Sequence, residues 1–177
     1  MPRLWGKVNG INDEIASKTA NAIMELAVRY HVDVIVFEHL DKTGKIRGSK
    51  KQILKLWRSN TVQAIVTTKA HRLGMRISRV CAWNTSKYAY DGSGTVLRGK
   101  DGEFNTYELC KFPNGKIYNC DLSASYNIGA RYFIRELLKS LNVSSRSRIE
   151  AKVPGCRERS TCTFSTLISL NAALRSA

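Results

Sequence analysis

The sequence has no hydrophobic run that approaches the roughly 18 to 20 apolar residues a transmembrane helix requires. Its first ten residues, MPRLWGKVNG, lack the apolar central segment of a secretory signal peptide. The five cysteines are an odd number in a chain without an export signal, which favours reduced thiols over a disulfide framework. We therefore expect a cytoplasmic protein that has no membrane partner.

Acidic residues are also scarce. The chain has 14 Asp and Glu against 29 Lys and Arg, and its net charge of +15 is spread from Arg3 to Arg175. Such a surplus ordinarily neutralises phosphates, and it makes binding strongly dependent on salt. The charge does not distinguish DNA from RNA. A ribosome-like structural protein, a solvated basic domain and an anionic membrane surface remain alternatives.

Apolar residues make up 43% of the 177, enough for one globular domain with a tail. Residues 12–30 follow a helical period, with Asn12 as the expected N-cap. Residues 32–37 (VDVIVF) form a β-branched and aromatic run that predicts a strand covered on both faces. The apolar face of the helix is expected to contain Ile15, Thr19, Ile23, Leu26 and Tyr30.

A second helix is predicted over residues 52–73 and a second strand over 76–83. The resulting order of helix, strand, helix, strand predicts an α/β architecture. Basic residues in and before the second helix could contact a nucleic-acid backbone, or they could form a solvated helix surface. They are Lys50, Lys51, Lys55, Arg58, Lys69 and Arg72.

The rest of the chain divides into three segments. Residues 84–120 contain short segments punctuated by glycine, which predict small hairpins. Residues 121–141 predict another helix, and residues 142–177 a basic linker followed by a short helix from near Ser165. The buried face of the helix over 121–141 is expected to contain Leu122, Tyr126, Gly129, Phe133 and Leu137.

Two carboxylates stand at the ends of predicted elements. Glu38 follows the strand over 32–37, and Asp121 begins the helix over 121–141. Acidic residues gathered at such ends can hold Mg²⁺ for phosphodiester hydrolysis. The alternatives are a solvated Glu and an ordinary N-cap Asp.

The segments around these carboxylates carry a family resemblance. VIVFEHL, around Glu38, resembles the second RuvC motif of TnpB/OrfB proteins, in which a Glu follows an apolar strand. NCDLSASYNIGARY resembles the third motif, in which an Asp opens a helix and an Asn-Ile pair follows. The order of elements over residues 12–141 also matches, including Thr85-Ser86 ahead of a glycine-rich insert. The chain therefore resembles the C-terminal part of a transposon-encoded TnpB/OrfB protein.

This resemblance implies an RNase H-like, RuvC-type mixed sheet with flanking helices and, in complete members, RNA-guided cleavage of DNA by three acids with Mg²⁺. By position, Glu38 and Asp121 match the second and third acids, so they would be the catalytic residues and the Mg²⁺ ligands. The first acid, in an Asp-x-Gly pattern, has no counterpart upstream of Glu38. We therefore expect a fold that is incomplete at its N-terminus and a chain that does not cleave unaided. The implied partners are DNA, a guide RNA and a separate N-terminal fragment that supplies the missing Asp.

Many relatives also carry a four-cysteine zinc ribbon in the insert. Here Ala89 and Gly92 take the places of the first two cysteines, and Cys110 and Cys120 have the wrong spacing. We expect no zinc site. The degenerate ribbon should instead be held by packing of Tyr88, Tyr90, Tyr107 and Tyr118.

The predicted organisation is the middle part of a RuvC-like core over 1–83, a degenerate zinc-ribbon-like insert over 84–120, the last core helix over 121–141 and a basic tail over 142–177. Three functional hypotheses remain open. They are a nuclease completed by a separate fragment, a non-catalytic nucleic-acid-binding module, and a decayed remnant without activity.

Overall fold

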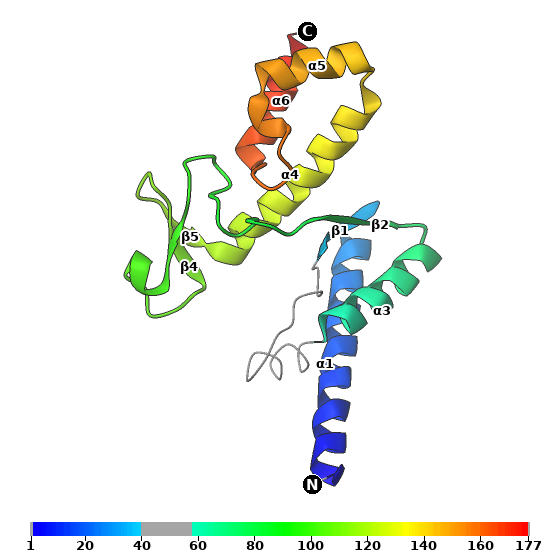
Figure 1. Cartoon of the computed structure of the whole chain (residues 1–177). Helices are drawn as coiled ribbons and strands as arrows, with labels where there is room; N and C mark the ends of the chain where they lie inside the picture. The colour runs from blue at the N-terminus through cyan, green and yellow to red at the C-terminus, as the bar shows by residue number, and fades with distance from the viewer. Residues whose placement is uncertain (1, 40–57, 177) are drawn as a thin grey trace. The chain divides into compact units, whose positions relative to one another are not determined.

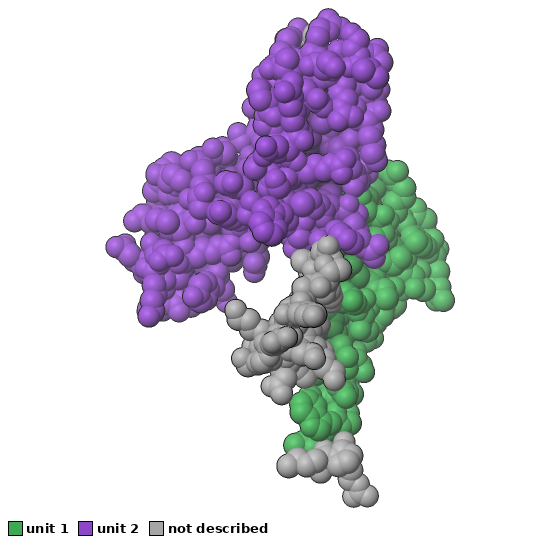
Figure 2. Space-filling model, viewed as in Figure 1, with its two compact units in different colours: residues 1–37, 41–78 green, residues 38–40, 79–177 purple. Residues whose placement is uncertain are grey.

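The computed structural model describes residues 2–39 and 58–176, and it contains both helices and strands (Figure 1). The α/β class expected from the sequence is confirmed. The chain divides into two compact units (Figure 2). The first consists of Met1–Phe37 and Asp41–Ser78, and the second of Glu38–Leu40 and Arg79–Ala177.

Two helices form the described part of the first unit, together with the strand residues that belong to it. The helices are α1 (Pro2–Arg29) and α3 (Ser59–Arg72), and they pack against each other. Their contact buries an apolar cluster of Ala20, Met24, Val66 and Ala70. Of the helix predicted over 52–73, residues 52–57 lie outside the described part of the chain.

Helix α1 begins ten residues before the expected position, so the prediction of Asn12 as N-cap is wrong. The helix continues through Gly6 and Gly10, each of which costs about 1 kcal/mol relative to alanine. Contacts with the residue before α3 offset part of this cost. Arg58 Nε lies 2.9 Å from Asp13 Oδ1, and Arg58 Nη2 donates to Asn9 Oδ1 at 3.3 Å.

The buried face of α1 also differs from the predicted one. Ile15, Leu26 and Tyr30 are more than half exposed. The buried residues are Ala16, Ala20, Met24 and Ala27. The small side chain of alanine suits a close contact between two helices. Because alanine contributes little to an apolar pattern, the periodicity of the larger side chains indicated the wrong face.

Both strands predicted in the first half of the chain are present. They are β1 (Val34–His39) and β2 (Arg76–Cys81), which form a two-stranded sheet. The boundary between the units crosses both strands. Residues 34–38 of β1 are half-buried, so the expectation of a strand fully covered on both faces is wrong for the described structure.

The insert in the second unit contains the expected hairpins. Its strands are β3 (Leu97–Arg98), β4 (Leu109–Lys111) and β5 (Ile117–Asn119), which pair antiparallel in the order β3-β4-β5. A short 3-10 helix, Gly99–Gly102, follows β3. The predicted hairpin character of this segment is confirmed.

Aromatic packing accompanies the small sheet, as predicted. The Tyr90 ring centroid lies 5.3 Å from that of Tyr118 and 5.8 Å from that of Phe112. Tyr107 is 77% exposed, so its expected part in this packing is wrong. Ala89, at the place of a zinc-ribbon cysteine, is buried in one apolar cluster with Cys110 and Cys120.

Three helices complete the second unit. They are α4 (Cys120–Ser140), α5 (Val143–Lys152) and α6 (Phe164–Arg175), with a 3-10 turn at Pro154–Cys156. Helix α4 and the terminal helix were predicted, whereas the expectation of a basic linker over the residues of α5 is wrong. These helices bury Ala130, Ile134, Leu138, Ile149, Cys156, Cys162 and Leu170 together.

Helix α5 has a local start signal and a tertiary anchor. The Asn142 side chain caps it by accepting a hydrogen bond from Ser145 N at 2.8 Å. Arg146 and Glu150 form an ion pair one turn apart at 2.6 Å. Its single buried residue, Ile149, provides no apolar period that the sequence could reveal, so packing on α4 and α6 decides the helix.

Within the described residues, the longest helices are too polar for any of them to cross a bilayer.

Candidate functional site

Helix α4 buries a different face from the one its apolar residues predicted. Leu122 and Phe133 are more than half exposed, and Tyr126 is 43% exposed. The buried face instead contains Ser123, Asn127 and Arg131, spaced by four residues. This spacing places the three polar side chains on one side of the helix. We call them, together with Arg135, the polar stripe.

The polar stripe binds the backbone of residues 79–90, which comprise the end of β2 and the segment after it. Arg135 donates to Arg79 O at 2.8 Å, and Arg131 donates to Cys81 O at 2.6 Å and Trp83 O at 2.8 Å. One turn nearer the start of α4, Asn127 Nδ2 donates to Thr85 O and Tyr88 O, each at 2.9 Å. Ser123 Oγ accepts from Tyr90 N at 3.3 Å. Segment 79–90 is thus fastened along α4 in the opposite direction.

Two members of the stripe also hold the start of the C-terminal helix. Asn127 Oδ1 accepts from Phe164 N at 3.1 Å. Arg131 donates to Ser160 O at 2.7 Å and to Cys162 O at 3.2 Å. The sequence signal for this buried face was the four-residue spacing of its polar side chains. A search for apolar periodicity does not detect such a pattern.

The glutamate predicted as a site residue is linked to this arrangement. The Thr85 hydroxyl is hydrogen-bonded to Glu38 Oε1, and it also lies 3.1 Å from Ala82 O. Asn127 in turn binds the carbonyl of Thr85. The three segments that resemble family motifs, at Glu38, Thr85 and Asn127, are therefore joined by consecutive hydrogen bonds.

The second predicted acid, Asp121, lies in the first turn of α4. The N-cap is Asn119, whose Oδ1 accepts from Asp121 N and Leu122 N at 3.0 Å each, so the alternative of Asp121 as N-cap is wrong. Asp121 is exposed. A carboxylate in the first turn is favoured by the helix dipole.

The structure does not join the two predicted acids directly. In residues 2–39 and 58–176, the hydrogen bonds of Glu38 and Asp121 go to other residues, Thr85 and Asn119. The same residues contain no group of three or more His, Cys, Asp or Glu placed to hold a metal ion. That Glu38 and Asp121 bind Mg²⁺ together at one site therefore remains a prediction.

The basic residues predicted to contact nucleic acid have different surroundings. Lys50, Lys51 and Lys55 lie outside the described residues. Arg58 is paired with Asp13, and Lys69 Nζ donates to Asn21 Oδ1 at 2.5 Å, so both connect α3 to α1. Arg72 is exposed in the last turn of α3. Phosphate contact by these residues stays a prediction.

A distant relative of this chain carries the name of the family that the motifs resemble. The chain is 29% identical over 135 residues to the TnpB-like protein aq_aa05 of Aquifex aeolicus (strain VF5). The alignment covers 71% of this chain and 42% of the relative, so the chain spans less than half of the relative's length. No protein-family model matches the chain. The similarity supports a TnpB-family relationship.

Most thiols of the second unit are held in their neutral form. Burial raises the pKa of Cys110 to about 12 and the pKa of Cys162 to about 11. Cys81 is the exposed one of the five cysteines, all of which are described. Because the thiolate is the reactive form, exposure and pKa together set the order of reaction.

We expect iodoacetamide at neutral pH to modify Cys81 and to leave Cys110 and Cys162 unmodified until urea unfolds the protein. Peptide mass spectrometry of samples taken during the reaction gives the rate at each site. Equal rates at Cys81 and Cys110 in the folded protein would contradict the burial and the raised pKa of Cys110.

Proposed function

We propose that this chain is a TnpB/OrfB-type, transposon-associated protein that binds nucleic acid. In this proposal the second unit contains part of a RuvC-like site, to which Glu38 and Asp121 contribute two of the family's three acids. The observation that carries the proposal is the hydrogen-bonded connection from Glu38 through Thr85 to Asn127. It joins three segments, far apart in the sequence, that each resemble a family motif.

The basic composition supports the binding part of the proposal. A net charge of +15 over 177 residues favours a polyanionic partner, and DNA is the partner that the family resemblance implies. Binding would release counterions from the phosphate backbone. The logarithm of the binding constant should therefore fall linearly with the logarithm of the salt concentration, by about 0.9 per phosphate neutralised on duplex DNA.

The fit of Mg²⁺ to the described residues is incomplete. Carboxylate oxygens are the ligands that Mg²⁺ prefers, and Glu38 Oε1 is already engaged by Thr85. The described residues contain no group of three or more His, Cys, Asp or Glu that could hold a metal ion. We therefore expect this chain by itself to bind nucleic acid without cleaving it. A nuclease would require a third carboxylate from a separate fragment.

The test is to incubate the purified chain with labelled single- and double-stranded DNA and Mg²⁺, and to record binding and cleavage in the same samples at several salt concentrations. Glu38→Gln and Asp121→Asn are the site variants. Asp101→Asn and Glu103→Gln are matched controls at two exposed acids of the insert, one in the 3-10 helix and one at its C-cap. We expect salt-sensitive binding by all five proteins and no cleavage.

Two results would change this conclusion. Cleavage that disappears in both site variants and persists in both controls would show a complete active site in this chain. Binding that does not weaken with salt, or no binding to either DNA, would contradict the proposed nucleic-acid binding.

A further inference from the structure

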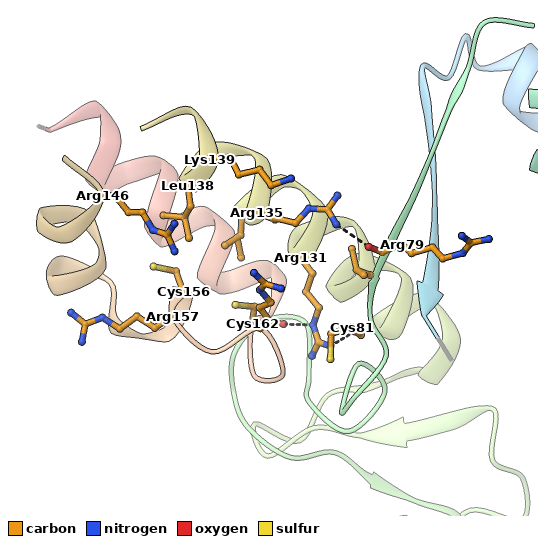
Figure 3. Close-up of a pocket in the computed structure, with 13 residues that line it drawn as sticks. Arg79, Cys81, Arg131, Arg135, Leu138, Lys139, Arg146, Cys156, Arg157 and Cys162 are labelled. Carbon is orange, nitrogen blue, oxygen red and sulfur yellow. Dashed lines mark hydrogen bonds between the residues drawn. The ribbon is translucent and has the colours of Figure 1, made fainter. Parts of the chain in front are cut away.

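A basic pocket of about 150 Å³ lies in the second unit beside the polar stripe (Figure 3). Its walls come from the end of β2, from α4 and α5, and from the segment after the 3-10 turn at Pro154–Cys156. Seven of its thirteen lining residues are Arg or Lys, and none is Asp or Glu. Besides Arg131, the cations are Arg79, Arg135, Lys139, Arg146, Arg157 and Arg159.

Nearby carboxylates offset only part of this charge. Glu136 lies 2.8 Å from Arg135 Nε and 3.4 Å from Lys139 Nζ. Glu150 lies 2.6 Å from Arg146 Nε and 3.9 Å from Arg157 Nε. Glu38 and Glu158 also act electrostatically, on Arg131 and Cys162. The lining itself consists of seven cations without a carboxylate, so the pocket surface is positive.

Arg131 brings this positive charge into the interior. It is 5% exposed, and its four hydrogen bonds from Nε, Nη1 and Nη2 all end on neutral backbone carbonyls. Burial lowers the pKa of its guanidinium, and the charge of Glu38 is among the influences that oppose this shift. A buried cation that contacts carbonyls and no anion is stabilised further when an anion approaches.

We propose that this pocket binds a phosphate group of a nucleic-acid strand. The inference rests on the proposed nucleic-acid binding and assigns one contact of that binding to named residues. A cavity of about this volume accepts a benzene-sized molecule, so a phosphate group fits. Arginine, which supplies six of the seven cations, presents a planar fork of donors that matches phosphate oxygens.

The placement of the arginines favours a strand over a free ion. Arg157 and Arg159 are exposed and belong to the same wall of the pocket. A backbone phosphate can reach between such side chains while its sugar and base stay outside.

The pocket also contains a residue that can report on its occupancy, because Cys81 lines it and is exposed.

The experiment measures binding of a short fluorescent single-stranded DNA by anisotropy over a range of salt concentrations. The pocket variant is Arg157→Gln with Arg159→Gln. The control is Arg148→Gln with Arg175→Gln, which removes two exposed arginines from the same unit without altering the pocket lining. In parallel, alkylation of Cys81 is followed without ligand, with the DNA, and with inorganic phosphate at matched ionic strength. Circular dichroism checks that each variant is folded.

We expect the pocket variant to bind roughly tenfold more weakly, with a salt slope reduced by about one phosphate contact, and the control to change by less than about threefold. The DNA should slow alkylation of Cys81 in the wild-type protein and the control, but not in the pocket variant. Inorganic phosphate should give much weaker protection.

Three outcomes would overturn this assignment. Equal weakening of both variants would leave nucleic-acid binding intact but spread over the surface, so the pocket would not be its site. Protection by inorganic phosphate alone, without tighter strand binding than in the pocket variant, would identify a site for a free anion. No salt-sensitive binding by the wild-type protein would overturn the pocket and the proposed function together.

Discussion

Replacing Asn127 with alanine is expected to lower the free energy of unfolding by about 3 kcal/mol or more, because each buried polar group left without a partner costs about 1 to 3 kcal/mol. The Asn127 side chain is fully buried and binds three backbone groups, Thr85 O, Tyr88 O and Phe164 N. Without this side chain, the three backbone groups would have to form hydrogen bonds with water or shift to new partners. Urea denaturation followed by circular dichroism measures the change.

Two further variants separate hydrogen bonding from volume. Asn127→Leu keeps a side chain of similar size without the bonds, and it should be destabilised at least as much as the alanine variant. Ser125→Ala, on an exposed position of the same helix, should change the free energy of unfolding by less than about 0.5 kcal/mol. A loss in Asn127→Leu no larger than in Ser125→Ala would show that the three bonds contribute little.

The effect at Asn127 should extend to the candidate site. Asn127 holds the carbonyl of Thr85, and the hydroxyl of Thr85 is bonded to Glu38. A variant that releases this segment removes the support of the Glu38 carboxylate without changing any charged residue. Asn127 is thus a positioning residue in the proposed function.

Replacing Arg131 with methionine is expected to destabilise the protein by about 3 to 5 kcal/mol, since four backbone carbonyls lose their donor at once. Methionine retains most of the apolar volume of the side chain, so the loss reports chiefly on the guanidinium. The measurement is again the urea-dependent free energy of unfolding.

Arg131→Lys tests whether the planar shape of the guanidinium matters. Lysine keeps the charge but has three donors on one nitrogen, which cannot reach carbonyls on both segment 79–90 and segment 160–162. We expect it to recover less than half of the loss seen in Arg131→Met. The exposed Arg148→Met serves as the control, with a change of less than about 0.5 kcal/mol. Full recovery by lysine would mean that charge alone is required.

Local patterns in the sequence predicted several elements correctly. The β-branched run before Glu38, the glycine-punctuated hairpins and the helix that begins near Asp121 all depend on neighbouring residues, and all are present. Elements without such a pattern were missed. Helix α5, which has one buried residue, is an example. The helix over residues 12–30 was predicted, but the first part of α1, which contains Gly6 and Gly10, was not.

The faces of the helices were harder to predict than their positions. Apolar periodicity selected Leu122 and Phe133 of α4, yet the helix buries Ser123, Asn127 and Arg131. A polar side chain can be buried when a partner backbone satisfies it, and those partners are about 30 to 50 residues away in the chain. The four-residue spacing of these polar side chains is visible in the sequence, but the distant backbone groups that they bind are not.

By itself, the sequence determined the positive charge of this protein, its α/β class and the places of Glu38 and Asp121 at the ends of their elements, since composition and short-range periodicity suffice for these properties. Only the tertiary structure decided that a polar stripe on α4 fastens segment 79–90, that Thr85 links Glu38 to Asn127, and that arginines from four segments gather around one pocket. Each of these depends on contacts between residues distant in the chain, which form only when the helices and loops have packed.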